Sequence, residues 1–128
     1  LKDKLEDYFT LRGEISMKPE AKVKKNVVKQ LKLMGAYYFY PVTGGYGRSG
    51  VPDIVGCYSG NFFGIECKAG SNEPTPLQMH NLDEISRQGG ISLVVNENNM
   101  NDVGKLLEML AQRNPSGEKK TDGLFLRF

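Results

Sequence analysis

Two acids and a lysine stand close together along the chain, in the stretches Gly50-Val51-Pro52-Asp53 and Ile65-Glu66-Cys67-Lys68. Two carboxylates held a few ångströms apart repel each other when both are ionised, so together they favour a divalent cation. Mg²⁺ takes oxygen ligands and keeps several waters, which suits two carboxylates and the backbone carbonyl of Cys67. A lysine beside them could hold or deprotonate a bound water, or stabilise charge on a phosphate. These residue types therefore predict a polar patch that attracts a cation.

A β-hairpin would bring these groups together. Ser59-Gly60-Asn61 supplies turn residues between two apolar, β-branched and aromatic runs. With Gly60-Asn61 as the two-residue loop, Asp53 lies opposite Lys68, and Glu66 shares their face because side chains alternate along a strand. The other face receives the apolar residues Ile54, Tyr58, Phe63 and Ile65. A slip of one residue would move the acid among them, so the hydrophobic pattern favours this register.

A structural explanation of Glu66-Cys67-Lys68 is also available. An acid and a lysine two residues apart on a strand commonly form a solvated ion pair that contributes little to stability. Pro52-Asp53 in the preceding hairpin arm changes the balance, because the predicted register adds a second carboxylate to the same patch. We therefore favour a functional site over a surface ion pair.

Pro52-Asp53, a short hairpin and Glu66-Cys67-Lys68 together resemble the core motif of the PD-(D/E)XK nucleases. A longer ordered set resembles the VRR-NUC family within them: Gly50-Val51-Pro52-Asp53, Phe63-Gly64-Ile65-Glu66-Cys67-Lys68, Thr75 to Gln78, and Gly89-Gly90. The similarity extends from about Glu20 to Val95. Cys67 stands where an aliphatic residue is more typical, but only its carbonyl is needed as a ligand.

The resemblance implies metal-dependent hydrolysis of DNA phosphodiester bonds by an α/β domain, a small mixed β-sheet flanked by helices with a restriction-endonuclease-like core. It implies that Asp53, Glu66 and the Cys67 carbonyl bind Mg²⁺ or Mn²⁺, and that Lys68 acts on the attacking water or neutralises the phosphate. Small stand-alone members of this fold resemble Holliday-junction resolvases. We therefore expect a homodimeric, structure-selective endonuclease that acts on duplex, branched or flapped DNA.

Glu20 and Gln78 each have a structural and a functional explanation. Glu20 lies in the first turn of a helix predicted over Lys18–Met34, where an acid interacts favourably with the helix dipole. Thr75-x-x-Gln78 fits a capping box at the start of a helix predicted over Thr75–Gln88. The resembling family has a glutamate of the first helix and a glutamine of the second near its active site. The resemblance thus implies that Glu20, which could also bind the metal, and Gln78 complete the site.

The glycine-rich segment Thr43 to Gly50 runs directly into Pro52-Asp53. It lacks the G-K-[ST] signature of a phosphate-binding loop, and no helix follows it. Its position next to the acids makes Tyr46, Arg48 and Ser49 candidate contacts to the phosphates or bases of a nucleic acid. A flexible connector is the structural alternative.

Other charged residues receive no catalytic role. His80, the only histidine, lies about 200° around its helix from Gln78, so we interpret it as a surface residue rather than a general base. Lysines crowd the first predicted helix and form a solvated face that could also contact phosphates. They are Lys18, Lys22, Lys24, Lys25, Lys29 and Lys32.

Length and composition indicate a single domain. The 128 residues, 39% hydrophobic and 25% charged, are enough for one core. There is no run of about 18 apolar residues to predict a membrane span, and the formal charge of +2 is too small to indicate nucleic-acid binding by itself. Cys57 and Cys67 point to opposite faces of the predicted hairpin, so we expect no disulfide and a reducing, cytoplasmic location in association with DNA.

The remaining pattern completes a core over about residues 18–112. It predicts a strand over Tyr37–Val42, a buried strand over Ile91–Val95 reached by a helical crossover, and a helix over Asn101–Gln112. A polar linker precedes the apolar segment Leu124–Phe128, which is either an extra strand or a dimer contact. A short helix is predicted over Leu1–Ser16. Two other functions compete with hydrolysis: a non-catalytic nucleic-acid-binding module, and an assembly protein that oligomerises through the C-terminal segment.

Overall fold

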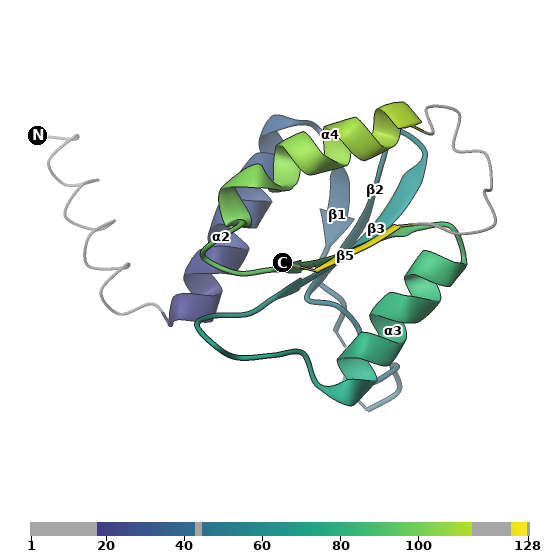
Figure 1. The fold of residues 1–128 in the computed structure, drawn as a ribbon. Coiled ribbons are helices and arrows are strands. Elements are labelled where there is room, and N and C mark those ends of the chain that lie inside the picture. Colours follow the sequence, from purple (N-terminus) through teal and green to yellow (C-terminus); the bar gives the residue numbers. More distant parts are fainter. Residues whose placement is uncertain (1–17, 43–44, 114–123, 128) are drawn as a thin grey trace, which may run out of the picture.

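The computed structural model describes residues 18–42, 45–113 and 124–127, and the helix predicted over Leu1–Ser16 and the polar linker lie outside them. The fold is a small mixed α/β arrangement, in which helices flank a five-stranded sheet of order β1-β2-β3-β4-β5 (Figure 1). Its elements are α2 (Pro19–Leu33), β1 (Tyr37–Phe39), β2 (Ile54–Tyr58), β3 (Asn61–Cys67), α3 (Pro76–Arg87), β4 (Ile91–Val95), the 3₁₀ turn η1 (Met100–Asp102), α4 (Val103–Arg113) and β5 (Leu124–Arg127). No helix of the described residues has the length and apolar character needed to cross a membrane.

The sheet is antiparallel on one side and parallel on the other. β1, β2 and β3 pair antiparallel in chain order, whereas β4 is parallel to β3 and β5 is parallel to β4. The parallel pairs require crossover connections, which α3 and α4 supply. The predicted crossover to a strand over Ile91–Val95 is confirmed, and this strand is buried along its whole length. Of the two explanations for the C-terminal segment, the structure contains the extra strand.

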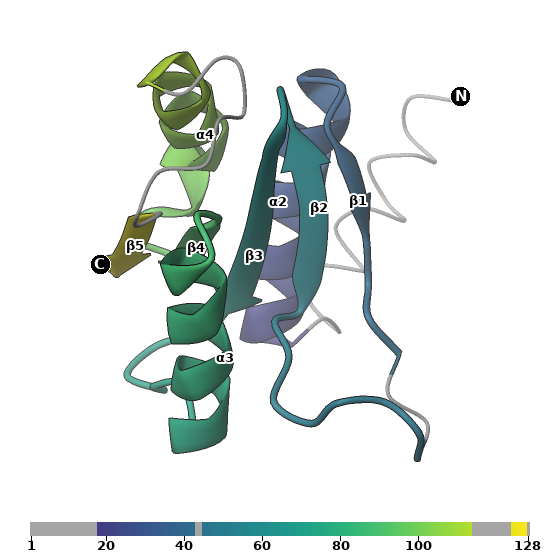
Figure 2. The ribbon, with the colours of Figure 1, turned by 90° about the vertical axis from the view of Figure 1, so that its right-hand side faces the viewer.

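Helices cover both faces of the sheet. α2 and α4 pack on one face and α3 on the other, so that the sheet lies between α2 and α3 in Figure 2. The main core lies on the α2–α4 face, where alternate strand residues meet the apolar stripes of the two helices. Its fully buried members include Val23, Val27, Leu31, Ile54, Phe63, Ile65 and Leu93. The other strand residues point towards α3.

The hairpin register differs from the prediction. The two-residue loop is Ser59-Gly60 rather than Gly60-Asn61. Its two residues have φ angles of 52° and 80°, and positive φ at both positions is what a type I′ hairpin turn requires. Continued by one residue, this register places Asp53 opposite Glu66 and not opposite Lys68, as predicted. Because the shift is by two residues, every side chain keeps its predicted face.

The first helix follows its prediction closely, and the first strand is shorter than predicted. α2 begins after Lys18 and ends near Gly35, whose φ of 72° suits the residue that follows a helix. The strand predicted to continue to Val42 ends at Phe39. Pro41 has no amide hydrogen to donate, so it cannot extend the ladder.

Candidate functional site

Asp53 and Glu66 meet at the end of the hairpin that lies away from its turn. Asp53 directly precedes β2, and its Oδ2 accepts a hydrogen bond from the amide of Cys67 at 2.9 Å. Glu66 stands near the end of β3, where it is 1% exposed. The carboxyl groups of these two acids are hydrogen-bonded to each other. The hairpin thus positions the two acids through its own backbone.

The environment of Glu66 strongly favours its neutral form. Burial is the largest cause, and the hydrogen bond to Asp53 and the charge of Asp53 add to it, so the pKa of Glu66 rises from 4.5 to about 9. The charge of Lys68 opposes this rise without cancelling it. Within the described structure, Oε2 of Glu66 is buried and has no hydrogen-bond partner. An orphaned buried oxygen is costly to the fold, and a cation could satisfy it.

Lys68 links the acids to α2. Its side chain is 14% exposed, and its Nζ lies 3.8 Å from Oε1 of Glu20, which is half exposed. The Lys68 amide also donates to the carbonyl of Val95 at 2.8 Å, which fixes the backbone beyond β3. Glu20 therefore reaches the site as the partner of Lys68. Its charge contributes to the raised pKa of Glu66.

The donor set fits a cation that keeps part of its water. Nowhere in residues 18–42, 45–113 and 124–127 do three or more His, Cys, Asp or Glu side chains converge to hold a metal ion. Asp53 and Glu66 offer two carboxylates, one with an unpartnered oxygen. Mg²⁺ is usually bound through one or two carboxylates with waters completing its shell. The two acids therefore suit Mg²⁺ or Mn²⁺ better than a metal that needs a cage of protein ligands.

Gln78 has the structural role that its spacing predicted. The amide of Thr75 donates to Oε1 of Gln78 at 2.9 Å, and the Gln78 amide donates to Oγ1 of Thr75 at 3.2 Å. This is a complete capping box at the start of α3. Within the described part of the chain, the hydrogen bonds of Gln78 to Thr75 belong to this cap and do not join it to the two acids.

The glycine-rich loop is attached to α3 just before it reaches the acids. Arg48, a predicted phosphate contact, forms an ion pair with Glu84 of α3. The Ser49 carbonyl accepts a hydrogen bond from the side-chain amide of Asn81 at 3.1 Å. Tyr46 is fully exposed. The structure thus brings Arg48 and Ser49 to α3 and leaves Tyr46 in solvent.

Asn81 and Gly50 are positioning residues that the sequence did not indicate to us. Asn81 is 4% exposed, and its Nδ2 also donates to the carbonyl of Leu77 at 2.9 Å. Gly50 has a φ of 73°, and a Cβ there would lie 2.6 Å from Cγ of Leu77. In the sequence, the signal for Asn81 was its position as a polar residue next to Leu82, which lies on the inward face of a predicted helix. Together these contacts dock the segment that leads into Asp53 on α3.

His80 and the cysteines agree with the sequence interpretation. The His80 side chain is 59% exposed and lies 3.3 Å from Glu84, so it is a surface residue. Cys57 is exposed, Cys67 is buried, and both are free. Burial, followed by the charges of nearby acids, raises the pKa of the Cys67 thiol. Its side chain therefore packs as a small apolar group in the core.

No protein-family model, curated protein or solved structure was found to match this chain. What the site does must therefore be inferred from its own chemistry.

Proposed function

We propose that this protein is a metal-dependent DNA nuclease with a restriction-endonuclease-like core. The observation that supports this most directly is the carboxyl pair of the half-buried Asp53 and the buried Glu66, with the largely buried Lys68 beside it. A buried acid with an unpartnered oxygen destabilises the fold, so its presence calls for a functional reason. The order of elements from α2 to β4 is also the order that the sequence predicted for such a core.

Each residue has a role that follows from its position. Asp53 and Glu66 would hold the cation, and the Cys67 amide keeps the Asp53 carboxylate oriented towards its partner. When bound, Mg²⁺ or Mn²⁺ would supply positive charge that polarises the scissile phosphate and lowers the pKa of a water. Lys68 would orient that water or neutralise charge on the phosphate. Glu20 holds the lysine ammonium from the side of α2.

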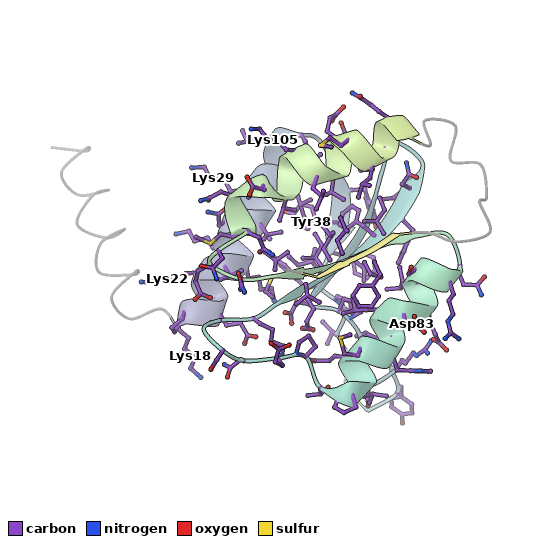
Figure 3. All side chains as sticks on the ribbon, in the orientation of Figure 1. Lys18, Lys22, Lys29, Tyr38, Asp83 and Lys105 are labelled. Carbon is purple, nitrogen blue, oxygen red and sulfur yellow. The ribbon has the colours of Figure 1, made fainter. Side chains whose placement is uncertain are left out.

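The lysine-rich face of α2 supports DNA as the substrate. Lys18, Lys22 and Lys29 project from this helix in Figure 3. The exposed lysines of the helix and its N-cap are Lys18, Lys22, Lys25, Lys29 and Lys32. Contacts from such a face to phosphates would make binding fall as salt rises. We further propose a structure-selective endonuclease that acts as a homodimer, since two sites would cut two strands of a branched substrate symmetrically.

Cleavage of labelled duplex, flap and four-way-junction DNA in Mg²⁺, Mn²⁺ or EDTA tests this proposal. We expect metal-dependent cutting that Lys68→Ala and Asp53→Asn each reduce at least about 100-fold, as is typical for loss of a group that acts on a proton or a developing charge. Lys105→Ala, which removes an exposed lysine from α4, is the matched control and should retain activity. Cutting that survives in both site variants would refute the proposal.

Cation binding offers an independent measurement. Titration with Mn²⁺, followed by its electron paramagnetic resonance signal, should show a site that Asp53→Asn weakens. Asp83→Asn is the control, because Asp83 pairs with Arg87 on the exposed side of α3. A Mn²⁺ affinity that is equal in both variants would show that the carboxyl pair is not the cation site.

A non-catalytic DNA-binding module is the second candidate. It is favoured by the hydrogen bond between Glu66 and Asp53, because a protonated carboxyl group and a neighbouring carboxylate can satisfy each other without a cation. Such a module would bind DNA in a salt-dependent manner and cut none of the substrates. Asp53→Asn would then leave binding unchanged, whereas loss of the α2 lysines would weaken it.

A further inference from the structure

A cavity of about 470 Å³ lies beside the glycine-rich loop, between the strands and α3. Its lining is mostly apolar. Phe39 of β1, Val55 of β2 and Phe62 of β3 form the sheet side, and Ile85 of α3 lies across from them. A volume of this size is typical of sites for small molecules rather than of flat protein contacts.

The cavity is lined by the residues on either side of Asp53, namely Pro52 and, one residue beyond Ile54, Val55. Val55 follows Asp53 by two residues, so the two side chains point to the same face of the sheet. Two residues along a strand span about 6.6 Å. Val51 and Pro52 line the cavity and lead directly into Asp53. A nucleotide with its phosphate at the acids would therefore have its base within reach of the cavity.

The walls offer the chemistry that a base requires. Phe39 and Phe62 are 48% and 47% exposed, so their rings are open to a planar ligand. Aromatic side chains stack on bases irrespective of sequence. The side-chain amide of Asn81 already donates both hydrogens, to Ser49 and Leu77, which leaves its oxygen as an acceptor.

Two polar groups complete the rim. Gln88 adds an amide donor and acceptor, the group that pairs with base edges in many nucleic-acid complexes. Arg48 also lines the cavity, where it pairs with Glu84. A mixture of aromatic faces, amide groups and one guanidinium suits a nucleobase better than an aliphatic side chain.

We propose that this cavity receives one unpaired nucleobase, so that the substrate is DNA with an unpaired nucleotide next to the scissile phosphate. The inference rests on the proposed nuclease function, and it defines the substrate class more narrowly. A base held in a duplex stack cannot enter a cavity, whereas a bulged or flap nucleotide reaches it at little unpairing cost.

The test uses duplex DNA with a single bulged 2-aminopurine, whose fluorescence falls when it stacks. Binding is measured in EDTA, so that no cutting occurs, and is compared with a fully paired duplex and with an abasic bulge. We expect fluorescence quenching on binding and about tenfold weaker binding of the abasic bulge, a loss in the range found for one stacked base.

Two aromatic variants and one control connect this binding to the cavity. Phe62→Ala and Phe39→Ala should each remove the quenching and most of the preference for the base. Leu33→Ala removes an 81% exposed side chain from α2, away from the cavity, and should change neither. Because both phenylalanines are half exposed, the variants should stay folded, which circular dichroism would verify.

Three results would overturn the inference: equal binding of the base-bearing and abasic bulges, quenching that survives in both aromatic variants, or a dimer in analytical ultracentrifugation that Phe62→Ala dissociates. The last would identify this face as a contact between copies of the chain. Quenching without cleavage in Mg²⁺ would support base binding in the cavity and refute the proposed nuclease function. Metal-dependent cleavage that is equal for paired and bulged DNA would support the nuclease function and refute base binding in the cavity.

Discussion

The two faces of the sheet consist of alternate residues of the same strands, yet they enclose different chemistry. Against α2 and α4 the central strand residues are apolar, among them Ile54, Phe63 and Leu93, all fully buried, and the buried polar Asn61 lies at the hairpin end of this face. Against α3 they present Glu66, 1% exposed, and Ser92, fully buried. The apolar face supplies most of the stability, because burial of apolar surface is the main favourable term in folding. This leaves the opposite face able to carry groups that cost stability.

The α3 face accommodates its polar residues through the helix itself. Ser92 donates its hydroxyl to the carbonyl of Leu82, and Asn81 bridges the helix and the glycine-rich loop. α3 contacts β3, β4 and β5, whereas the cavity extends over β1 and β2. Because the core on the α2–α4 face is fully packed, the α3 face of the same sheet can be polar, partly open and suited to a ligand.

Phe62 and Phe63 are neighbours on β3 that point to opposite faces, so they measure the difference between the faces directly. Phe63 is fully buried, and its replacement by alanine should cost about 3–5 kcal/mol of unfolding free energy. Phe62→Ala should cost about 1 kcal/mol, because its ring is already half solvated. Chemical denaturation of both variants gives the two values. Equal losses would show that the α3 face is as important to stability as the core.

The pH dependence of stability should reveal the buried acid of the α3 face. The pKa of Glu66 is raised from 4.5 to about 9, so the folded protein retains a proton that the unfolded chain loses. The stabilisation that this bound proton gives the fold is fully present below about pH 4.5. As pH rises towards 9, the free energy of unfolding falls by at most about 1.4 kcal/mol per pH unit. Denaturation in EDTA at a series of pH values measures this loss.

The variant Glu66→Gln isolates the contribution of Glu66 to the pH dependence of stability, since the amide does not titrate. Between about pH 5 and pH 8.5 its stability curve should be flatter than that of the wild type and should lie above it at the alkaline end. Saturating Mg²⁺ should reduce the loss in the wild type, because a cation favours the ionised carboxylate. Parallel curves for the two proteins would show that Glu66 titrates near its ordinary value in the fold.

Gly50 and Gly35 provide a smaller and better matched test of how α3 holds the loop. Their φ angles are 73° and 72°, but a Cβ at Gly50 would collide with Leu77, whereas one at Gly35 has no atom within 4 Å. Alanine at Gly35 should cost about 1 kcal/mol through the backbone alone, and alanine at Gly50 about 1–2 kcal/mol more. Only Gly50→Ala should also weaken Mn²⁺ binding, since it displaces the segment that leads into Asp53. Equal costs and unchanged binding in both would indicate that this docking does not position the acid.

Much of the architecture could be predicted from local pattern. Pro19 and Gly35 delimit α2, Thr75 and Gln78 form their cap, and the apolar run over Ile91–Val95 is a strand buried on both faces. The residues that make up each of these signals lie close together in the sequence, so the signals can be interpreted without knowledge of the rest of the chain. The hairpin loop was misplaced by one residue because both Ser59-Gly60 and Gly60-Asn61 offer turn residues.

By itself, the sequence determined that Asp53 and Glu66 share one face of the hairpin, because side chains alternate with a period of two. It did not determine that Glu66 would be sealed from solvent, or that Arg48 would pair with Glu84. These features depend on where α3 lies, and this helix brings together segments that are distant along the chain. Only the tertiary structure could decide them, since burial and the pKa of a carboxyl group are properties of everything packed around it.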